Sequence, residues 1–547
     1  MIKKLTFYFI CLVVLLGCEP EAAIQKAQRM TKLAYGELEV CGDLIDVRSF
    51  EVSGEFYPQN SNYILKSDIN GIFTSPQKYA VSLKEKRGPQ KVRMGNDGEL
   101  VIASQAECLG CWGWRRTGDS FVMNDVTYYV HTKQCNADEW EMIPHVAGHF
   151  SSVVFGSNIR VVPDDLQGKL LAKVDVLRGG SHVSNAAITI LPDGTYLASC
   201  TGVASSKYPS FFQSRDKGET WTNVYVENYP VNGVVNYLSL FVHKGALYIL
   251  GCTKDGTNMM IQRSDDGGRT WTVPSDANSG LISTDVFHGA VVPVVESKGR
   301  LWRAAERARG TDYSKNHPVV LSCPVDADLL KASNWTITSE LVERDWNYDG
   351  HTFTSFIEGN AVVGKDGEVY DILRANASTT TEVAAKVRVT STTQVDFNES
   401  DFINMPGGGK KFVIRYDSVS DMYWALTNPA EDTTYFHSGM YYRGLDKGLM
   451  RNWLVLCCSR DLVNWEMHRT IVYCEDPFFH GYQYADWMFD GNDIIAVCRT
   501  GAPEERGLPS RQHDANLFTF HKIKNFRDKE KPEADSENIS VEYYDSS

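Results

Sequence analysis

The sequence has no excess of basic residues. Its 547 residues include 55 Lys and Arg against 69 Asp and Glu, which gives a formal net charge of −14 at pH 7. Because binding to a phosphate backbone requires a basic surface, this balance argues against nucleic acid as a partner. An anionic sugar stays compatible with it, because a few arginines gathered in one site can dominate the local field.

Long hydrophobic runs are absent beyond the N-terminus, where Leu5 to Leu16 form an apolar stretch too short to span a bilayer. Gly17 and Cys18 end this stretch, and a small residue before cysteine resembles the bacterial lipobox. The resemblance implies a signal peptide over residues 1–17 and a lipid anchor at Cys18. We therefore expect a cell-envelope protein whose anchor partner is the membrane, on the periplasmic or cell-surface side of the outer membrane. An ordinary signal peptide is the alternative.

The cysteines do not form a disulfide framework. Removing Cys11 and Cys18 from the 13 cysteines leaves eleven, and an odd number cannot all pair within one chain. Cys108 and Cys111 form a lone C-x-x-C, which we interpret as a disulfide or two thiols. A zinc site is the alternative, but it would need a second ligand pair, for which Cys135, His145 and His149 are the only nearby candidates. Four more lie in apolar strand-like runs, where cysteine serves as a small buried hydrophobe: Cys200, Cys252, Cys457 and Cys498.

Two copies of one eight-residue pattern are the strongest feature that the sequence contains. Both read S-x-D-x-G-x-T-W, from Ser214 to Trp221 and from Ser264 to Trp271. The Asp side chain can accept from backbone N–H groups of a turn, and the Gly supplies a positive φ. The Trp buries a large apolar face between neighbouring units. The spacing of the copies is about one four-stranded propeller blade.

This pattern is identified as the Asp-box of sialidase-like β-propellers, and the resemblance covers residues 164–527. It implies an all-β propeller of six blades, with seven as the alternative. Turn-plus-strand units at blade spacing support six, beginning at Leu191, Val242, Glu296, Gly364, Tyr416 and Phe489. Degenerate Asp-boxes end at Trp335 and Trp465.

The rest of the chain divides into three parts. Residues 36–163 alternate in a β-like pattern without Asp-boxes, which predicts an N-terminal β-sandwich. We interpret its aromatic residues, among them Trp114 and Tyr128, as core, with a sugar-stacking platform as the alternative. Residues 18–35 form a linker, and residues 528–547 have the composition of a disordered tail.

A propeller places its ligand site on its axis, so polar residues at the ends of strand-like runs are the candidates. For acid–base work these are His288, Glu306, Glu358, His480 and His513. For substrate binding they are Asn185, Arg303, Asn360, Arg374, Arg415, Tyr482, Gln483, Arg499 and Asn516. Each residue alone is compatible with a structural role, but their recurrence in four clusters favours one convergent polar site.

The superfamily resemblance implies a carbohydrate-active protein. The superfamily includes true sialidases and enzymes that remove terminal rhamnose from glucuronate by hydrolysis or elimination. True sialidases carry an Arg-Ile-Pro motif in the first blade and three arginines on the sialate carboxylate. This chain lacks that motif, and none of its arginines can be matched to the three by motif, which argues against a true sialidase.

We expect an exo-acting glycoside hydrolase that cleaves a terminal bond of an acidic extracellular glycan. A polysaccharide lyase acting at a uronate and a non-catalytic glycan-binding lipoprotein are the alternatives. Hydrolysis would use Glu306 with Glu358, whereas elimination would use His288, His480 or His513 with Tyr482. We expect an oligo- or polysaccharide as substrate, a monomeric chain, no organic cofactor and no catalytic metal. A structural calcium ion is compatible with such propellers, but no acidic loop identifies one.

Overall fold

The computed structural model describes residues 37–41, 45–50, 77–82, 91–105, 107, 113–123, 126–138, 141–143, 152–156, 158–162, 167–175, 180–204, 207–227, 229–230, 232–310, 316–342, 345–430, 447–474, 480–502 and 513–528. The predicted signal peptide, Cys18, the linker, the C-x-x-C pair and the tail after residue 528 lie outside these residues. The chain divides into two compact units, and the boundary in the sequence between their main segments lies between Asp165 and Leu166. Within the described residues, no helix has the length and hydropathy needed to cross a membrane.

The N-terminal unit contains two sheets. One has the order β10 (Asn158–Val162), β1 (Glu37–Cys41), β4 (Lys91–Met94), β8 (Glu141–Met142). The other has the order β2 (Ile45–Phe50), β3 (Gln77–Ser82), β9 (Val153–Gly156), β5 (Gly98–Ser104), β7 (Val126–Cys135), β6 (Arg115–Met123). Apolar residues of both sheets share one core, as in a sandwich. Trp114 and Tyr128 are buried, so these two aromatic side chains belong to the interior.

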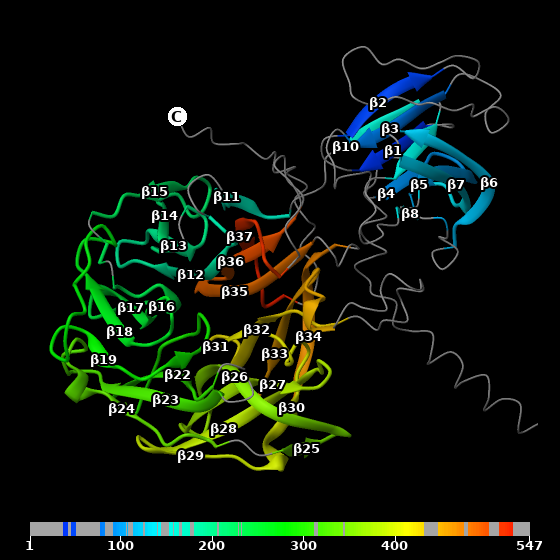
Figure 1. Cartoon of the computed structure of the whole chain (residues 1–547). Coiled ribbons are helices and arrows are strands. Elements are labelled where there is room, and N and C mark those ends of the chain that lie inside the picture. Colours follow the sequence, from blue (N-terminus) through cyan, green and yellow to red (C-terminus); the bar gives the residue numbers. More distant parts are fainter. Residues whose placement is uncertain are drawn as a thin grey trace, which may run out of the picture. The chain divides into compact units, whose positions relative to one another are not determined.

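The described residues of the second unit form six antiparallel sheets, which Figure 1 shows arranged around a common centre. The first two are β12 (Ser184–Ile190), β13 (Tyr196–Thr201), β14 (Ser210–Ser214), β15 (Thr222–Val224) and β16 (Asn236–His243), β17 (Ala246–Cys252), β18 (Met259–Ser264), β19 (Leu281–Ser283). The third is β20 (Phe287–His288), β22 (Arg300–Ala308), β23 (Asn316–Pro324), β24 (Thr336–Ile337), with β21 (Val295–Ser297) on β22.

The remaining three sheets complete the ring. The fourth is β25 (Trp346–Tyr348), β26 (His351–Val363), β27 (Val369–Ala377), β28 (Val383–Ser391), β29 (Gln394–Asp396), with β30 (Phe402–Asn404) on β28. The fifth is β31 (Val413–Asp417), β32 (Met422–Thr427), β33 (Trp453–Ser459), β34 (Trp465–Tyr473). In the sixth, β35 (Gly481–Asp490), β36 (Asp493–Gly501) and β37 (Leu517–Ile523) are joined by β11 (Lys169–Lys173) from the start of the unit.

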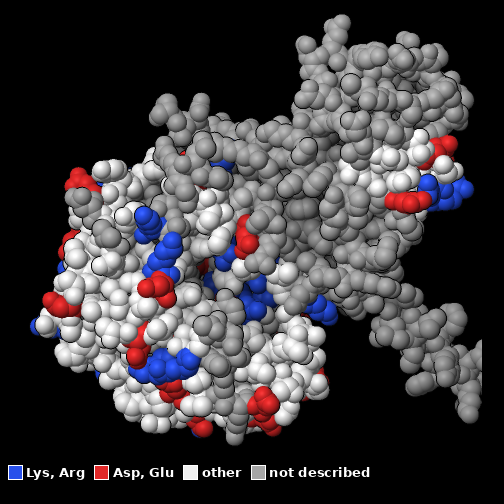
Figure 2. Space-filling model, viewed as in Figure 1, with Lys and Arg blue, Asp and Glu red and all other residues white. Residues whose placement is uncertain are grey.

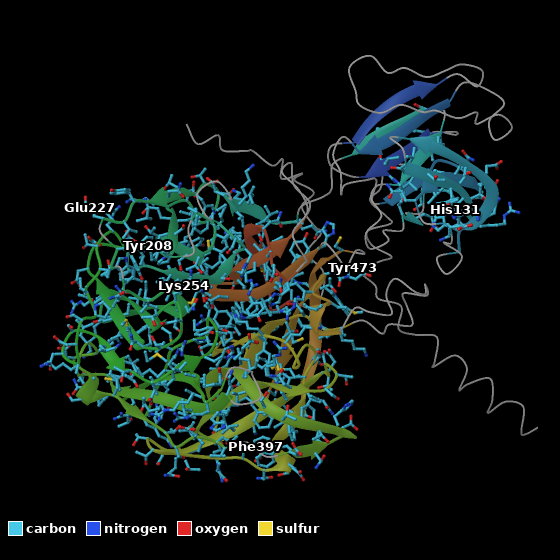
Figure 3. All side chains as sticks on the ribbon, viewed as in Figure 1. His131, Tyr208, Glu227, Lys254, Phe397 and Tyr473 are labelled. Atoms are coloured by element: carbon cyan, nitrogen blue, oxygen red, sulfur yellow. The ribbon has the colours of Figure 1, made fainter. Side chains whose placement is uncertain are left out.

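Apolar side chains pack between successive sheets, and Figure 3 shows side chains throughout the spaces between the strands. Separate core clusters join the sheets in cyclic order, the last one packing Ile188 of the first sheet against Val497 of the sixth. The all-β propeller fold expected from the sequence is thus present. Residues 431–446, between the second and third strands of the fifth sheet, lie outside the described residues.

The Asp-boxes form the turns that their residues predict. Asp216 accepts from the backbone N–H of Thr220 at 2.9 Å, and Asp266 accepts from that of Thr270 at 2.9 Å. Gly218 and Gly268 have φ values of 92° and 94°. The degenerate box keeps the same bonding around Asp461, with Leu462 at φ 63° where the other two have glycine. Each box joins the third strand of a sheet to the fourth.

Candidate functional site

The innermost strand of four sheets carries the same irregularity. The pairing register shifts within β12, β16, β26 and β35, and each shift contains a non-glycine residue at positive φ. These residues are Asn185 (52°), Tyr237 (54°), Glu358 (60°) and Tyr484 (52°). A β-bulge re-aims a side chain, and positive φ is strained for residues other than glycine. Such strain at equivalent positions of four sheets marks the inner ends of these strands as the candidate site.

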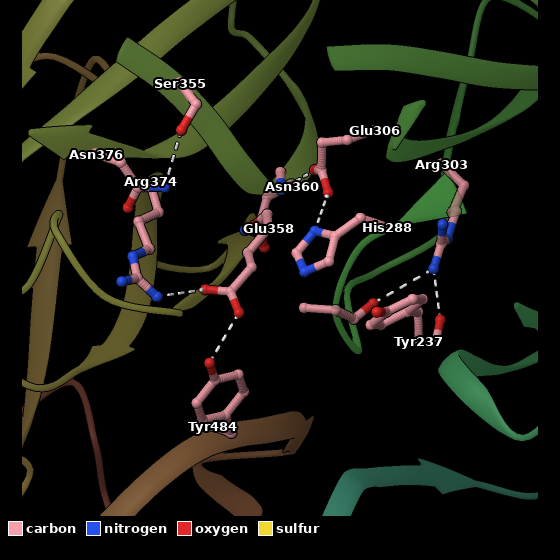
Figure 4. Close-up of polar contacts among 12 residues, drawn as sticks. Tyr237, His288, Arg303, Glu306, Ser355, Glu358, Asn360, Arg374, Asn376 and Tyr484 are labelled. Atoms are coloured by element: carbon pink, nitrogen blue, oxygen red, sulfur yellow. Dashed lines mark hydrogen bonds and ion pairs between the residues drawn. The ribbon is translucent and has the colours of Figure 1, made fainter. Parts of the chain in front are cut away.

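Glu358 and Tyr484 meet across the axis from the fourth and sixth sheets. The Tyr484 hydroxyl donates to Glu358 Oε1 at 2.8 Å, and Arg374 Nη1 donates to Glu358 Oε2 at 3.3 Å (Figure 4). Burial acts to raise the pKa of Glu358, but the charges of Arg374 and His288 outweigh it and lower this pKa. Burial and the Glu358 charge raise the pKa of Tyr484. The proton therefore rests on the tyrosine and points at an ionised carboxylate.

Two further arginines surround Tyr484. The guanidinium carbons of Arg499 and Arg451 lie 4.3 Å and 5.1 Å from the centroid of its ring. Burial, with repulsion from Arg374 and Arg499, lowers the pKa of Arg451 to about 10, so it stays charged at neutral pH. Nη1 of Arg451 is buried and has no hydrogen-bond partner among the described residues.

Figure 2 shows basic side chains gathered in a hollow near the middle of this propeller face. Three like charges held together out of water need compensating negative charge. Glu358 forms an ion pair of 3.3 Å with Arg374, and its charge also attracts that of Arg451. Arg374, Arg451 and Arg499 together are therefore suited to binding a further carboxylate from a ligand.

His288 forms a second pair with Glu306 in the third sheet. Its Nδ1 lies 2.9 Å from Glu306 Oε2, and Glu306 Oε1 accepts from the backbone N–H of Gly359 at 3.1 Å (Figure 4). Glu306 is fully buried, and the His288 side chain is 11% exposed. The Tyr237 ring lies against His288, with 5.0 Å between ring centroids. Because Gly359 follows Glu358 in the chain, the bulge of β26 that carries the Glu358 carboxylate also binds the Glu306 carboxylate through its backbone.

His513 contacts Tyr484, Arg499 and Gln483. The His513 carbonyl accepts from Arg499 Nη2 at 2.6 Å and from Gln483 Nε2 at 3.2 Å. Its ring contacts that of Tyr484 edge-on, and Nδ1 lies 2.8 Å from Asp514 Oδ1. Burial, with the charges of Arg451 and Arg499, lowers the pKa of His513 to about 4. The imidazole is therefore neutral at pH 7 and supports the arginines rather than donating a proton.

Several residues selected from the sequence have their polar atoms engaged elsewhere. The Asn360 side chain donates to the carbonyl of Phe412 at 3.2 Å and accepts from the N–H of Ile414 at 3.2 Å, which joins the fourth sheet to the fifth. Arg415 donates to the carbonyl of Trp487 and so joins the fifth sheet to the sixth. These contacts hold the ring closed and leave little capacity for a ligand.

Other selected residues are also built into the framework. The Asn516 side chain accepts from the N–H of Ala502 and donates to its carbonyl. Asn185 Oδ1 accepts from the backbone N–H of Tyr237 at 2.8 Å. Arg303 is fully buried and donates to backbone carbonyls. Tyr482 and His480 are both buried, at 0% and 2% exposure.

Sequence reasoning missed Tyr484, Arg451, Tyr237 and Asp371. The Asp371 carboxyl is buried at 1% exposure, and neither of its oxygens has a hydrogen-bond partner among the described residues. Burial and the charge of Glu306 raise its pKa well above the usual range. One signal could have found Tyr484: like Asn185 and Glu358, it is a polar residue followed by Ala or Gly within an inner strand.

The described residues contain no group of three or more His, Cys, Asp or Glu placed to hold a metal ion. The cysteines whose side chains the structure describes are unbridged, and Cys200, Cys252, Cys457 and Cys498 are buried as expected.

No protein-family model and no curated protein matches the chain. Among solved structures, an α-L-arabinanase of Penicillium chrysogenum is 14% identical over 67% of this chain and 99% of its own, with a TM-score of 0.42. A Hadza microbial sialidase is 12% identical over 78% and 90%, with a TM-score of 0.44. A Streptococcus pneumoniae sialidase is 8% identical over 82% and 84%, with a TM-score of 0.41. Likenesses this weak carry no conclusion about activity. By its own ring of sheets the second unit is an all-β propeller, and its Asp-box turns resemble those of the sialidase-like β-propellers.

Proposed function

We propose that this protein is an exo-acting glycoside hydrolase that cleaves the terminal bond of a carboxylate-bearing sugar. The observation that carries the proposal is the contact of 2.8 Å between the Tyr484 hydroxyl and Glu358, placed among three arginines. A hydroxyl beside an ionised carboxylate is an activated nucleophile. An arginine cluster beside it selects an anionic substrate.

In the first step, the arginines hold the substrate carboxylate and so place the anomeric carbon over Tyr484. The Tyr484 oxygen forms a bond to that carbon while its proton passes to Glu358. The glycosidic bond breaks, and the leaving oxygen takes a proton from His288, which Glu306 orients through the contact of 2.9 Å.

In the second step, a water molecule attacks the anomeric carbon and gives its proton to His288. The bond to Tyr484 breaks, and the Tyr484 oxygen takes its proton back from Glu358. Two displacements at one carbon return the original configuration, so the free sugar is released with retention. Elimination at a uronate would need no bond to Tyr484 and would release an unsaturated sugar.

The test is a screen of residues 19–547 against fluorogenic glycosides of sialate, glucuronate and galacturonate. Their methyl esters, which lack the negative charge, are the matched controls. We expect release from at least one acid and at least tenfold slower release from its ester. Proton NMR of the first product should show the retained anomer. An ultraviolet-absorbing uronate product would replace hydrolysis by elimination, and binding of an acidic oligosaccharide without any product would indicate a capture protein.

We also propose the envelope location that the lipobox at Cys18 implies. Labelling of growing cells with a radioactive fatty acid should mark the wild-type chain. The Cys18→Ala variant should stay unlabelled and appear in the soluble fraction. Equal labelling of both chains would contradict the anchor.

A further inference from the structure

Two consecutive lysines lie buried just before β31. Lys410 is 0% and Lys411 is 1% exposed, and each ammonium donates to one backbone carbonyl. Lys410 Nζ lies 2.7 Å from the oxygen of Asn428, and Lys411 Nζ lies 2.7 Å from the oxygen of Ala485. Burying a charged amine is unfavourable unless local groups compensate it, so the burial of each lysine indicates a specific structural role.

The Lys411 contact falls on the bulge that carries Tyr484. The register of β35 shifts between Gln483 and Asp486, so Tyr484 and Ala485 form the irregular segment. A bulge leaves a residue outside the regular ladder, and its conformation then depends on other contacts. The bond from Lys411 supplies such a contact one residue after Tyr484, which is held at φ 52°.

Charged and titratable groups from four strands face Lys411. Asp486 of β35 and Glu358 of β26 attract its charge, as does Cys498 of β36 when ionised, and Arg415 of β31 repels it. Burial, opposed by the two carboxylates, lowers the pKa of Lys411 to about 8. The amine therefore loses its charge in a pH range that an activity assay can reach.

We propose that Lys411 is a positioning residue, whose ammonium holds the Ala485 carbonyl and thereby keeps the Tyr484 hydroxyl against Glu358. The inference rests on the proposed function and adds a residue that does not touch the substrate. Loss of the ammonium charge weakens a charge-assisted hydrogen bond, so the bulge relaxes and Tyr484 moves away from Glu358. Small displacements of this kind reduce turnover strongly.

The test compares Lys411→Met with Lys410→Met, two neighbouring lysines of equal burial. For Lys411→Met we expect kcat to fall about 10- to 100-fold with KM nearly unchanged. The alkaline limb of the wild-type kcat profile, near pH 8, should be absent from this variant. Lys410→Met should keep both kcat and the limb. An equal loss of kcat in the two variants, or an alkaline limb retained in Lys411→Met, would overturn the inference.

A second measurement separates this inference from the proposed function. If no acidic glycoside is cleaved, the proposed function fails, and a crystal structure of Lys411→Met still tests the positioning role. A contact between Tyr484 and Glu358 that is unchanged from 2.8 Å overturns the role, and a lengthened one supports it. If the variant does not fold, the active wild-type protein decides the matter, because a flat kcat between pH 7 and 9.5 excludes control by Lys411.

Discussion

Replacing Tyr484 by phenylalanine removes one hydroxyl and little else. The ring that Arg499 and Arg451 contact at 4.3 Å and 5.1 Å remains. Glu358 keeps its bond to Arg374 at 3.3 Å but loses the closer donor at 2.8 Å. We expect the free energy of unfolding to fall by about 1.5–3 kcal/mol, since a hydrogen bond to a buried charge is lost.

The effect on turnover distinguishes two roles of the hydroxyl. A hydroxyl that only positions Glu358 is worth about 1.5–3 kcal/mol, which corresponds to a loss of about ten- to a hundredfold in kcat. A hydroxyl that forms the bond to the substrate cannot be replaced, and we expect kcat to fall by more than about a thousandfold. Steady-state release of a fluorophore from the best acidic glycoside measures this loss.

Tyr482→Phe is the matched control for Tyr484→Phe. Tyr482 lies two positions earlier in the same strand, is fully buried, and its hydroxyl accepts from the backbone N–H of Gln167 at 3.5 Å. We expect this variant to keep kcat within about threefold of wild type, because the bond that it loses to Gln167 is long and neutral. A Tyr484→Phe enzyme that retains more than about a hundredth of wild-type kcat would refute the assignment of Tyr484 as nucleophile.

Three further predictions follow from the site. Arg499→Met should raise KM for the acidic glycoside about 10- to 100-fold and leave KM for its methyl ester unchanged, and equal increases for both would contradict a carboxylate-binding role. Gly359→Ala places a Cβ 2.2 Å from Asp371 Oδ1, so thermal denaturation should show that the free energy of unfolding falls by about 1–3 kcal/mol. Gly289→Ala is the control, because its new Cβ meets nothing closer than 3.6 Å, and its free energy of unfolding should change little. In Asp371→Asn, the pH dependence of stability should be smaller. Burial and Glu306 raise the pKa of Asp371 in the folded state, so the folded protein binds the proton more tightly and the wild type loses stability as pH rises above the ordinary carboxyl range. Melting temperatures of the two proteins between pH 4 and 8 test this, and parallel curves would contradict it.

The propeller could be predicted because its signals are local. An Asp-box needs only eight residues to specify its turn, and the structure shows the bonds of Asp216 and Asp266 where the pattern places them. Each predicted turn-plus-strand unit joins two paired strands, because Gly, Asp and Ser set a hairpin without help from distant parts of the chain.

The site was less predictable because its geometry depends on register. Side chains alternate between the faces of a strand, and one extra residue reverses every later side chain. Glu358 and Asn360 are two positions apart in β26, yet Glu358 faces the axis and Asn360 bonds the fifth sheet. Tyr484 lies in β35 of the sixth sheet, and Arg451 lies just before β33 of the fifth. They meet only when these two parts of the chain pack together, and no pattern local to either segment contains that information.

The pairing of β11 with β37 determines when this protein can fold. Residues 169–173 leave the ribosome hundreds of residues before their partners at 517–523, so the ring stays open until β37 has been synthesised. Contacts of such sequence separation form slowly, and unpaired strand edges favour aggregation in the meantime. We expect the propeller to fold only after β37 has left the ribosome and to depend on protection during that interval. A permuted gene that encodes β11 directly after β37 would shorten the interval and should speed refolding.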